Sequence, residues 1–227
     1  MSTPPGGRTA CHRPELADRP LMDRWIISEL NALVKEVDAA LEDFDSQVAG
    51  RALARFIDDL SNWYVRRSRR RFWDGDPAAL GSLHECLVTL TQLLAPLVPF
   101  ITEQVWQELV RPTDSSAVDS VHLTNWPVAQ KSAINTELGS QVALTRRIVE
   151  LGRATRAESG IKIRQPLGRA LIAASGWSTL PEQMREQIAD ELNVADLADI
   201  ADADGDLVDI SVKANFRTLG AKFGGQV

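Results

Sequence analysis

The chain has 227 residues, of which 44% are hydrophobic and 25% are charged, a composition typical of a soluble globular protein. Its sequence holds no apolar run near the roughly 20 residues that a membrane-spanning helix needs, and we expect no secretory signal at its start. The two cysteines, Cys11 and Cys86, have neither the spacing of a disulfide framework nor that of metal ligands. We therefore expect a reducing, cytoplasmic setting.

The formal net charge of −6 hides an uneven distribution of charge along the sequence. Residues 181–211 hold ten of the 31 acidic side chains and a single basic one, so the remaining residues together carry a net charge of +3. Residues 66–71 read RRSRRR. A local basic patch is enough to bind a polyanion, so the acidic total does not exclude a nucleic-acid partner.

Two long helices are predicted after a linker. Residues 1–19 are rich in proline, glycine and arginine, which is typical of a linker or tail. Apolar residues then recur at steps of three and four over residues 20–44, which predicts a helix. A second amphipathic helix is expected over residues 46–72, before the strong stop signal of Asp74-Gly75-Asp76-Pro77.

Three further helices complete a predicted bundle. The third is expected over residues 77–96, because Pro96 ends or kinks a helix, and the fourth begins near Pro99. Residues 111–133 have a loop-like composition. A fifth helix over residues 135–159 is expected to join or extend the bundle. Long helices joined by short turns predict an antiparallel arrangement.

The hydrophobic period changes after Gly160 and predicts a small α+β module. Strands are expected over residues 167–174, 194–200 and 207–213, paired in one sheet, with a helix over residues 181–192 on one face. The predicted fold class is therefore mainly α, an antiparallel helical bundle followed by a small α+β module. We place a linker at residues 1–19, the helical domain at residues 20–160 and the α+β module at residues 161–227.

Polar residues of this module give two local expectations. Thr179 and Glu182 have the spacing of a capping box, in which each side chain bonds the other residue's backbone amide. We expect the acidic side chains between residues 196 and 209 to lie mostly in solvent. Their charge would repel RNA phosphates.

Motifs for catalysis are scarce in the sequence. The histidines, His12, His84 and His122, lie far apart, although a fold can bring distant residues together. The sequence has no P-loop, no Gly-x-Ser-x-Gly and no Gly-x-Gly-x-x-Gly turn. We expect His84, inside a helix, to pack or to lie on the surface, and Asp58 and Asp59 to pair with nearby arginines. No catalytic residue and no metal ligand is therefore assigned.

The most informative segment is the end of the second helix, which reads FIDDLSNWYVRRSRRRFW over residues 56–73. On a helix its arginines surround the end with positive charge, which cannot be buried on every side without a large desolvation cost. Guanidinium groups and an aromatic ring suit phosphates and an unpaired base of a single-stranded RNA loop. The candidate RNA-binding residues are Arg66, Arg69, Arg70, Arg71, Phe72 and Trp73.

The same residues allow a purely structural interpretation. The arginines could instead form ion pairs with four acidic side chains elsewhere in the bundle. These candidate partners are Asp58, Asp59, Glu103 and Glu108. The sequence pattern by itself leaves both interpretations open.

Several blocks of the sequence stand in a familiar order: DRWIISELNALV, FIDDLSNWYVRRSRRRFW, LAPLVPFITEQVW, SVHLTNWP, LGRATRAESGIKIRQPL, DELNV and VKANFRTLGAKFG. From about Leu21 to Gly224 the chain resembles the part of an isoleucyl-tRNA synthetase that follows the catalytic core, in its eukaryote-like type. The blocks NWYVRRSRRRFW and RQPL are specific to this resemblance, because the related valyl and leucyl enzymes share the helical bundle but not these blocks. One departure is Ala214, where the family usually has proline.

The resemblance implies an anticodon-binding region and the start of a C-terminal junction domain. The family's His-Ile-Gly-His and Lys-Met-Ser-Lys-Ser signatures are absent, so this segment is expected to be inactive alone and to bind no cofactor. The parent enzyme is expected to charge tRNA with isoleucine using ATP and Mg. The implied partners are the anticodon stem-loop of isoleucine-specific tRNA and the catalytic domain of the same parent chain, with no membrane.

The resemblance also orders the candidate contacts. Trp73 is expected to stack on an anticodon base and residues 66–71 to contact phosphates, unless this end of the helix packs against the catalytic domain. Two other functions remain open. One is a free-standing RNA-binding or scaffold protein that retains the bundle. The other is an unrelated helical enzyme whose site the fold assembles, which would show a deep pocket with converging titratable groups.

Overall fold

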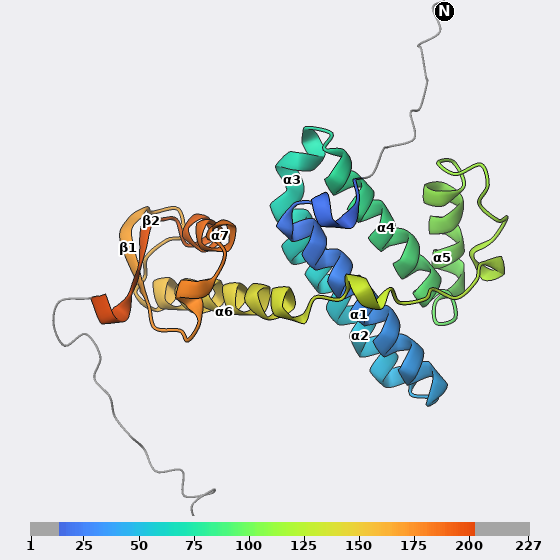
Figure 1. Ribbon diagram of the computed structural model, residues 1–227, viewed down its shortest axis with the longest axis horizontal. Helices are drawn as coiled ribbons and strands as arrows, with labels where there is room; N and C mark the ends of the chain where they lie inside the picture. Colours follow the sequence, from blue (N-terminus) through green and yellow to red (C-terminus); the bar gives the residue numbers. More distant parts are fainter. Residues whose placement is uncertain (1–13, 203–227) are drawn as a thin grey trace, which may run out of the picture. The chain divides into compact units, whose positions relative to one another are not determined.

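The computed structural model describes residues 14–202, which are mainly helical and contain one two-stranded sheet. The chain divides into two compact units, Met1–Ala143 and Leu144–Val227. The division falls inside helix α6 (Thr136–Glu158), so this helix contributes residues to both units (Figure 1). The domain boundary that the sequence predicts, between residues 160 and 161, follows the end of the same helix. No helix of the described part combines the length and apolarity needed to cross a bilayer.

The first unit is built on two long helices that run side by side (Figure 1). Helix α1 (Leu21–Glu42) buries an apolar stripe that includes Trp25, Ile26 and Leu30, as its periodicity predicts. Helix α2 (Ser46–Asp58) starts at Asp45, whose side chain accepts a hydrogen bond from the Val48 amide and so caps the helix.

The second predicted helix is one continuous helical path that changes its winding. A π-helical segment, Asp59–Val65, follows α2 and leads directly into α3 (Arg66–Trp73). Single π segments of this kind occur inside α-helices and often lie at functional sites. Helical structure over residues 46–73 confirms the prediction, whereas the change of winding has no signal in the hydrophobic pattern.

The expected breaks between the next helices are also present. Gly75, with φ at 71°, turns the chain after α3, and the Asp76 side chain accepts hydrogen bonds at the start of α4 (Pro77–Leu94). Helix α5 (Pro99–Val105) follows the interruption at residues 95–98 and continues as a second π segment, Trp106–Val110. Short 3-10 turns lie at Leu16–Asp18, Val121–Leu123, Lys131–Ala133, Trp177–Thr179 and Ile200–Asp202.

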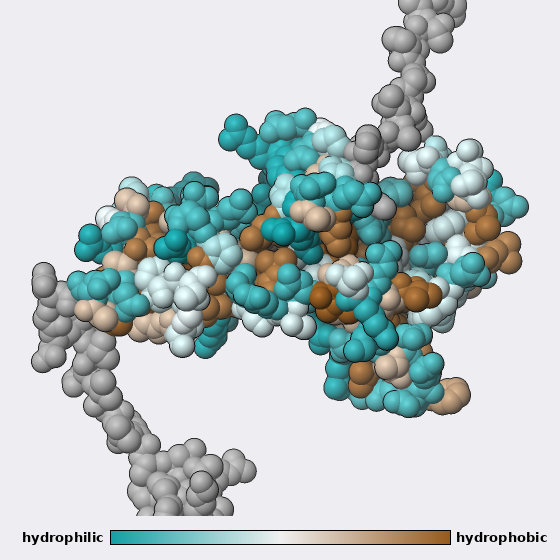
Figure 2. Space-filling model, viewed as in Figure 1, coloured by the Kyte–Doolittle hydropathy of each residue, from teal (hydrophilic) through white to brown (hydrophobic). Residues whose placement is uncertain are grey.

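Two surfaces of the first unit contrast in polarity. On the face that Figure 2 draws, hydrophilic residues cover the end of α3 and hydrophobic residues gather over α5. Beneath these surfaces the α1 stripe packs with residues such as Leu53 and Tyr64, which are almost completely buried. A smaller cluster joins Ala95, Trp106 and Val121 under the long loop.

The second unit contains a parallel strand pair joined by a helix. Strand β1 (Leu167–Ile172) pairs with β2 (Val194–Asp199), with Leu167 opposite Val194, and α7 (Glu182–Leu192) makes the crossover between them. Parallel strands require such a crossover connection. Two predicted strands and the predicted helix are therefore confirmed, and the third predicted strand lies outside the described residues.

The capping box predicted for α7 is wrong. The helix begins after Pro181, and no side chain caps it. Thr179 lies instead in a 3-10 turn, where its hydroxyl donates a hydrogen bond to the Gly176 carbonyl. The pattern failed because Pro181 takes the position before the helix that the threonine would have needed. Of the acidic side chains expected in solvent, Asp196 and Asp202 are exposed, whereas Asp199 is half-buried. The others, Asp204, Asp206 and Asp209, lie outside the described residues.

Candidate nucleic-acid interface

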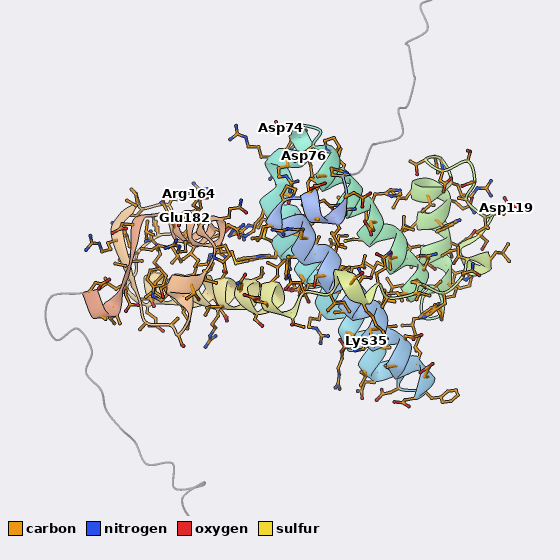
Figure 3. All side chains as sticks on the ribbon, in the orientation of Figure 1. Lys35, Asp74, Asp76, Asp119, Arg164 and Glu182 are labelled. Atoms are coloured by element: carbon orange, nitrogen blue, oxygen red, sulfur yellow. The ribbon has the colours of Figure 1, made fainter. Side chains whose placement is uncertain are left out.

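The end of α3 forms an exposed corner of the bundle. The helix closes with a hydrogen bond from the Asp74 amide to the Arg70 carbonyl, and the turn that follows carries Asp74 and Asp76 (Figure 3). The side chain of Trp73, the last residue of α3, is 80% exposed. The ring therefore lies in solvent, as the turn predicts, and an aromatic ring in this position is open to stacking.

Three of the candidate arginines are exposed beside this ring. Arg66, Arg69 and Arg70 lie on the solvent side of α3. The Arg70 side chain is 94% exposed, and its Nε atom lies 3.9 Å from a carboxylate oxygen of Asp74. Exposed ion pairs of this kind contribute little to stability, because solvent screens them. The guanidinium of Arg70 is thus accessible to an anion in solution. We name this group, Arg66, Arg69, Arg70 and Trp73, the basic end.

Arg71 is held differently, in a network inside the bundle. Its two terminal nitrogens each donate to one carboxylate oxygen of Asp23, both at 2.7 Å, and its Nε donates to Asp76, also at 2.7 Å. The hydrogen bond to Asp23 raises the pKa of Arg71, and the hydrogen bond from Arg71 lowers the pKa of Asp76. Because all three guanidinium nitrogens are engaged, Arg71 is poorly placed to bind a phosphate.

Tyr64 and Phe72 extend this network into the core. The Tyr64 hydroxyl donates to Asp23 at 2.8 Å, and its pKa is raised by burial and by the neighbouring carboxylate. Phe72 packs edge-on against the Tyr64 ring, with ring centres 6.1 Å apart. Phe72 is half-buried, so it supports the end of α3 and offers only part of its surface to a ligand. Asp23 itself is fully buried, so these partners compensate its charge.

Asp23 is a partner of Arg71 that is not among the four acidic residues expected from the sequence pattern. The ion pairs of Arg70 and Arg71 are with Asp74, Asp76 and Asp23. A signal was present, because Asp23 lies on the apolar stripe of α1 beside Met22 and three residues before Ile26. A carboxylate on a buried stripe requires a cationic or hydrogen-bonding partner.

Arg67 also turns away from solvent. Its guanidinium carbon lies 4.1 Å above the centre of the Trp63 ring, a cation–π contact, and its side chain is half-buried. The structural and RNA-binding interpretations of the arginines therefore divide along the helix. Arg67 and Arg71 serve the fold, whereas the basic end is exposed.

Side chains typical of catalysis do not converge elsewhere in residues 14–202. His84 is half-buried within α4, and the Nε2 atom of the exposed His122 lies 3.3 Å from the Pro99 carbonyl oxygen. Cys86 is buried, and burial raises the pKa of its thiol. Within this range no group of three or more His, Cys, Asp or Glu side chains is close enough to hold a metal ion.

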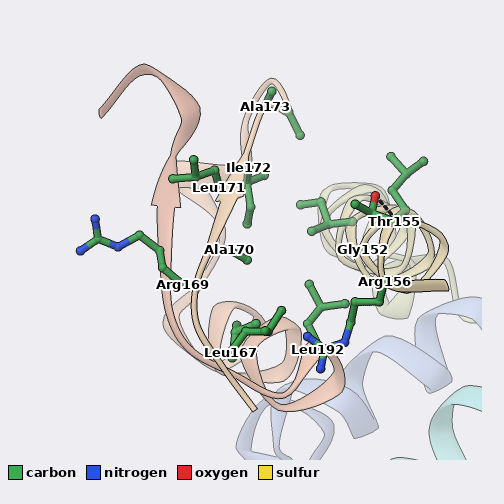
Figure 4. A pocket seen from close by; sticks show the side chains of 14 residues that line it. Gly152, Thr155, Arg156, Leu167, Arg169, Ala170, Leu171, Ile172, Ala173 and Leu192 are labelled. Carbon is green, nitrogen blue, oxygen red and sulfur yellow. Dashed lines mark hydrogen bonds between the residues drawn. The ribbon is translucent and has the colours of Figure 1, made fainter. Parts of the chain in front are cut away.

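A pocket of about 310 Å³ lies in the second unit, between α6 and β1 (Figure 4). Its lining is mostly apolar. Gly152 on α6 lies so close to the Leu192 side chain that a Cβ atom added to this glycine would be 2.6 Å from Leu192 Cδ2. Arg156 donates to backbone carbonyls that include that of Lys162, and Arg169 points away from the pocket to pair with Asp196. The pocket therefore lacks the converging acid and base groups of a catalytic site.

Comparison with known proteins gives consistent matches. Residues 23–172 match the family described as the anticodon-binding domain of tRNA ligase. The isoleucine–tRNA ligase of Streptomyces coelicolor is 59% identical over 94% of this chain and 20% of its own length. The enzymes of the same name from Thermobifida fusca and Deinococcus radiodurans are 60% and 41% identical over 93% and 94% of the chain. The chain spans about a fifth of the length of these relatives.

Proposed function

The chain belongs to the anticodon-binding domain family of tRNA ligases, and we propose that it binds the anticodon stem-loop of isoleucine-specific tRNA. The observation that carries this proposal is the basic end, where an exposed tryptophan stands beside three exposed arginines. The matched relatives carry the name isoleucine–tRNA ligase, which supports the choice of tRNA.

The basic end has two kinds of group for two parts of an RNA loop. Guanidinium groups bind phosphates with paired hydrogen bonds and remain charged at every physiological pH. In this proposal Arg66, Arg69 and Arg70 bind the backbone of the loop. Trp73 stacks on an unpaired base, an interaction that accepts any base because each has an aromatic face. The arginines thus supply affinity and the ring fixes the position of one nucleotide.

Arg71 and Phe72 have a supporting role in this proposal. Arg71 fixes the end of α3 to Asp23 on α1 and to Asp76 before α4, and Phe72 packs on Tyr64. A contact surface held by buried ion pairs loses less conformational entropy when a ligand binds. The sequence pattern suggests both residues for RNA contact, but in this proposal their contacts within the bundle position Trp73.

We further propose that the chain acts as one part of a longer isoleucine–tRNA ligase in the cytoplasm. The relatives are about five times as long as the region that they share with this chain. Isoleucine activation with ATP and Mg would then belong to the rest of such a protein. We also propose that such a ligase is of the eukaryote-like type, which some bacteria also carry; the matched relatives named above come from bacteria.

Replacement of Trp73 by alanine tests the proposal. Affinity for a synthetic anticodon stem-loop of isoleucine tRNA should fall by about 1–3 kcal/mol, the usual loss of one base-stacking ring. The melting temperature should change little, because the ring is exposed. Fluorescence titration and a thermal melt on the same sample give both values.

Phe44→Ala is the matched control, since Phe44 is 94% exposed and lies in the turn between α1 and α2, away from α3. It should leave RNA affinity unchanged. Equal affinities of the wild-type chain and the Trp73→Ala variant would contradict the stacking role. Absence of any preference for the isoleucine anticodon over a scrambled loop would favour the free-standing RNA-binding alternative.

A further inference from the structure

A second exposed region lies at the far end of α4 from Trp73. Five large apolar side chains are exposed where α4 turns into α5 and at the adjacent 3-10 turn, and we name them the apolar corner: Leu97, Val98, Phe100, Ile101 and Leu123. Phe100 is 91% exposed. Thr102 on α5 and Trp106 in the π segment that follows it are buried, so the corner is additional to the core.

The two parts of the apolar corner are fixed to each other. The Glu103 carboxylate on α5 accepts hydrogen bonds from the Ser120 hydroxyl at 2.8 Å and the Val121 amide at 3.1 Å. These bonds hold the turn that carries Leu123 against α5. The corner is therefore a preformed surface, and its burial would cost little ordering of the backbone.

The apolar corner differs chemically from the basic end and is poorly suited to bind RNA. Residues 86–102 contain no acidic residue, lysine or arginine, so the part of the corner where α4 turns into α5 lacks the lysine and arginine side chains that bind a phosphate backbone. Exposed apolar clusters of this kind occur at sites where proteins bind other proteins, membranes or apolar ligands. Because α4 has 18 residues, at 1.5 Å of rise per residue it separates the corner from the basic end by roughly 27 Å.

We propose that the apolar corner is the docking surface for the remaining body of an isoleucine–tRNA ligase chain. This inference rests on that part of the proposed function in which the chain belongs to a longer ligase. About four fifths of the length of each relative lies outside the shared region, which provides a protein partner of the required size. The basic end then stays open to RNA, because the two ligands occupy opposite ends of α4.

The test compares this chain alone with a chimera. The chimera is the Streptomyces coelicolor ligase with its matched region replaced by this sequence, which is 59% identical. Hydroxyl-radical labelling followed by mass spectrometry measures the exposure of Phe100, with Trp73 as the internal reference. Phe100 labelling should fall about fivefold in the chimera, as expected for a side chain in an interface core. Trp73 labelling should stay the same.

Two other outcomes would overturn the docking proposal. One is equal labelling of Phe100 in the chain and in the chimera. The other is protection of Phe100 in the chain alone together with a dimer mass by light scattering that Phe100→Ser abolishes, which would assign the corner to a second copy. The RNA titration of the same samples separates the two proposals, because Phe100→Ser should leave RNA affinity unchanged whether or not docking occurs.

A measurement on the chain alone keeps the inference testable if the chimera does not fold. The dye ANS binds accessible apolar surface, and Phe100→Ser should lower its fluorescence on this chain by about half, whereas Trp73→Ser should lower it less. An unchanged melting temperature would show that the variant still folds. Unchanged dye binding in a folded Phe100→Ser variant would mean that the corner is no accessible apolar surface and would overturn the proposal.

Discussion

The basic end and the apolar corner are both exposed, but exposure has a different physical meaning in each. Arg70 is 94% exposed and remains fully hydrated, so its position costs the free chain nothing. Phe100 is 91% exposed and keeps an aromatic ring in water, which is unfavourable by about 25 cal/mol for each Å² of apolar surface. Burial of the apolar corner against a partner would therefore be favourable in itself, whereas an exposed arginine gains free energy only from an anion that it binds.

The arginines near the end of α3 differ in their contacts. Arg71 is bonded to the buried Asp23 and to Asp76, while Arg70 makes only a long, exposed contact with Asp74. Arg71 thus fixes the helix end, whereas the guanidinium of Arg70 lies in solvent. Loss of the buried support of the basic end should therefore cost more stability than loss of its weaker contacts.

The largest effect is expected for Asp23→Ala. This change leaves Arg71 and the buried Tyr64 hydroxyl without their shared carboxylate. Loss of one partner from a buried charged pair should lower the free energy of unfolding by about 3–5 kcal/mol. Urea denaturation followed by tryptophan fluorescence measures this loss.

Asp74→Ala is the control for Asp23→Ala. Its carboxylate is exposed, so the free energy of unfolding should change by less than about 0.5 kcal/mol. If the two aspartates proved equally important, the central role of the Asp23 network would be lost.

A smaller effect is expected from acidification, through Asp76. The hydrogen bond from Arg71 and those from the Ala79 and Ala78 amides hold the pKa of Asp76 below its ordinary value of 3.8. A carboxylate with a lower pKa in the folded state stabilises the fold fully above its unfolded pKa. This contribution is lost as the pH falls through the folded pKa. The wild-type chain should therefore lose stability below about pH 4.

Asp76→Asn isolates this contribution, because asparagine still caps a helix but does not titrate. The variant should be less stable than the wild type by about 1 kcal/mol or less at pH 7, and the difference should shrink as the pH falls towards 2. Urea denaturation at both pH values measures it. A difference that stays constant with pH would exclude ionisation of Asp76 as its cause.

The sequence predicted those parts of the fold that depend on the periodicity of apolar residues and on local turn signals. The apolar stripes of α1 and of residues 46–73 predicted the bundle, and the Asp74–Pro77 signal predicted the turn that exposes Trp73. These features follow from the local spacing of residue types.

Features that depend on distant contacts were beyond the sequence pattern. The pairing of Arg71 with Asp23 joins residues 48 positions apart, and no local spacing encodes it. The π segment at Asp59–Val65 leaves the apolar steps almost unchanged, so the pattern does not reveal it. The apolar corner was not expected either. In the sequence, Leu97 and Phe100 resemble core residues of an amphipathic helix, and only the fold shows that their side chains are exposed.

The salt dependence of RNA binding tests the contrast between the two regions most directly. The titration uses the anticodon stem-loop of isoleucine tRNA and compares two variants, Arg66→Gln/Arg69→Gln/Arg70→Gln and Phe100→Ser. Each lost phosphate contact should reduce the slope of log affinity against log salt by about 0.7–0.9, so the triple variant should lose about 2 units and bind more weakly. Phe100→Ser should keep both the affinity and the slope of the wild-type chain. An unchanged slope in the triple variant, or an equal loss in Phe100→Ser, would contradict the assignment of RNA to the basic end.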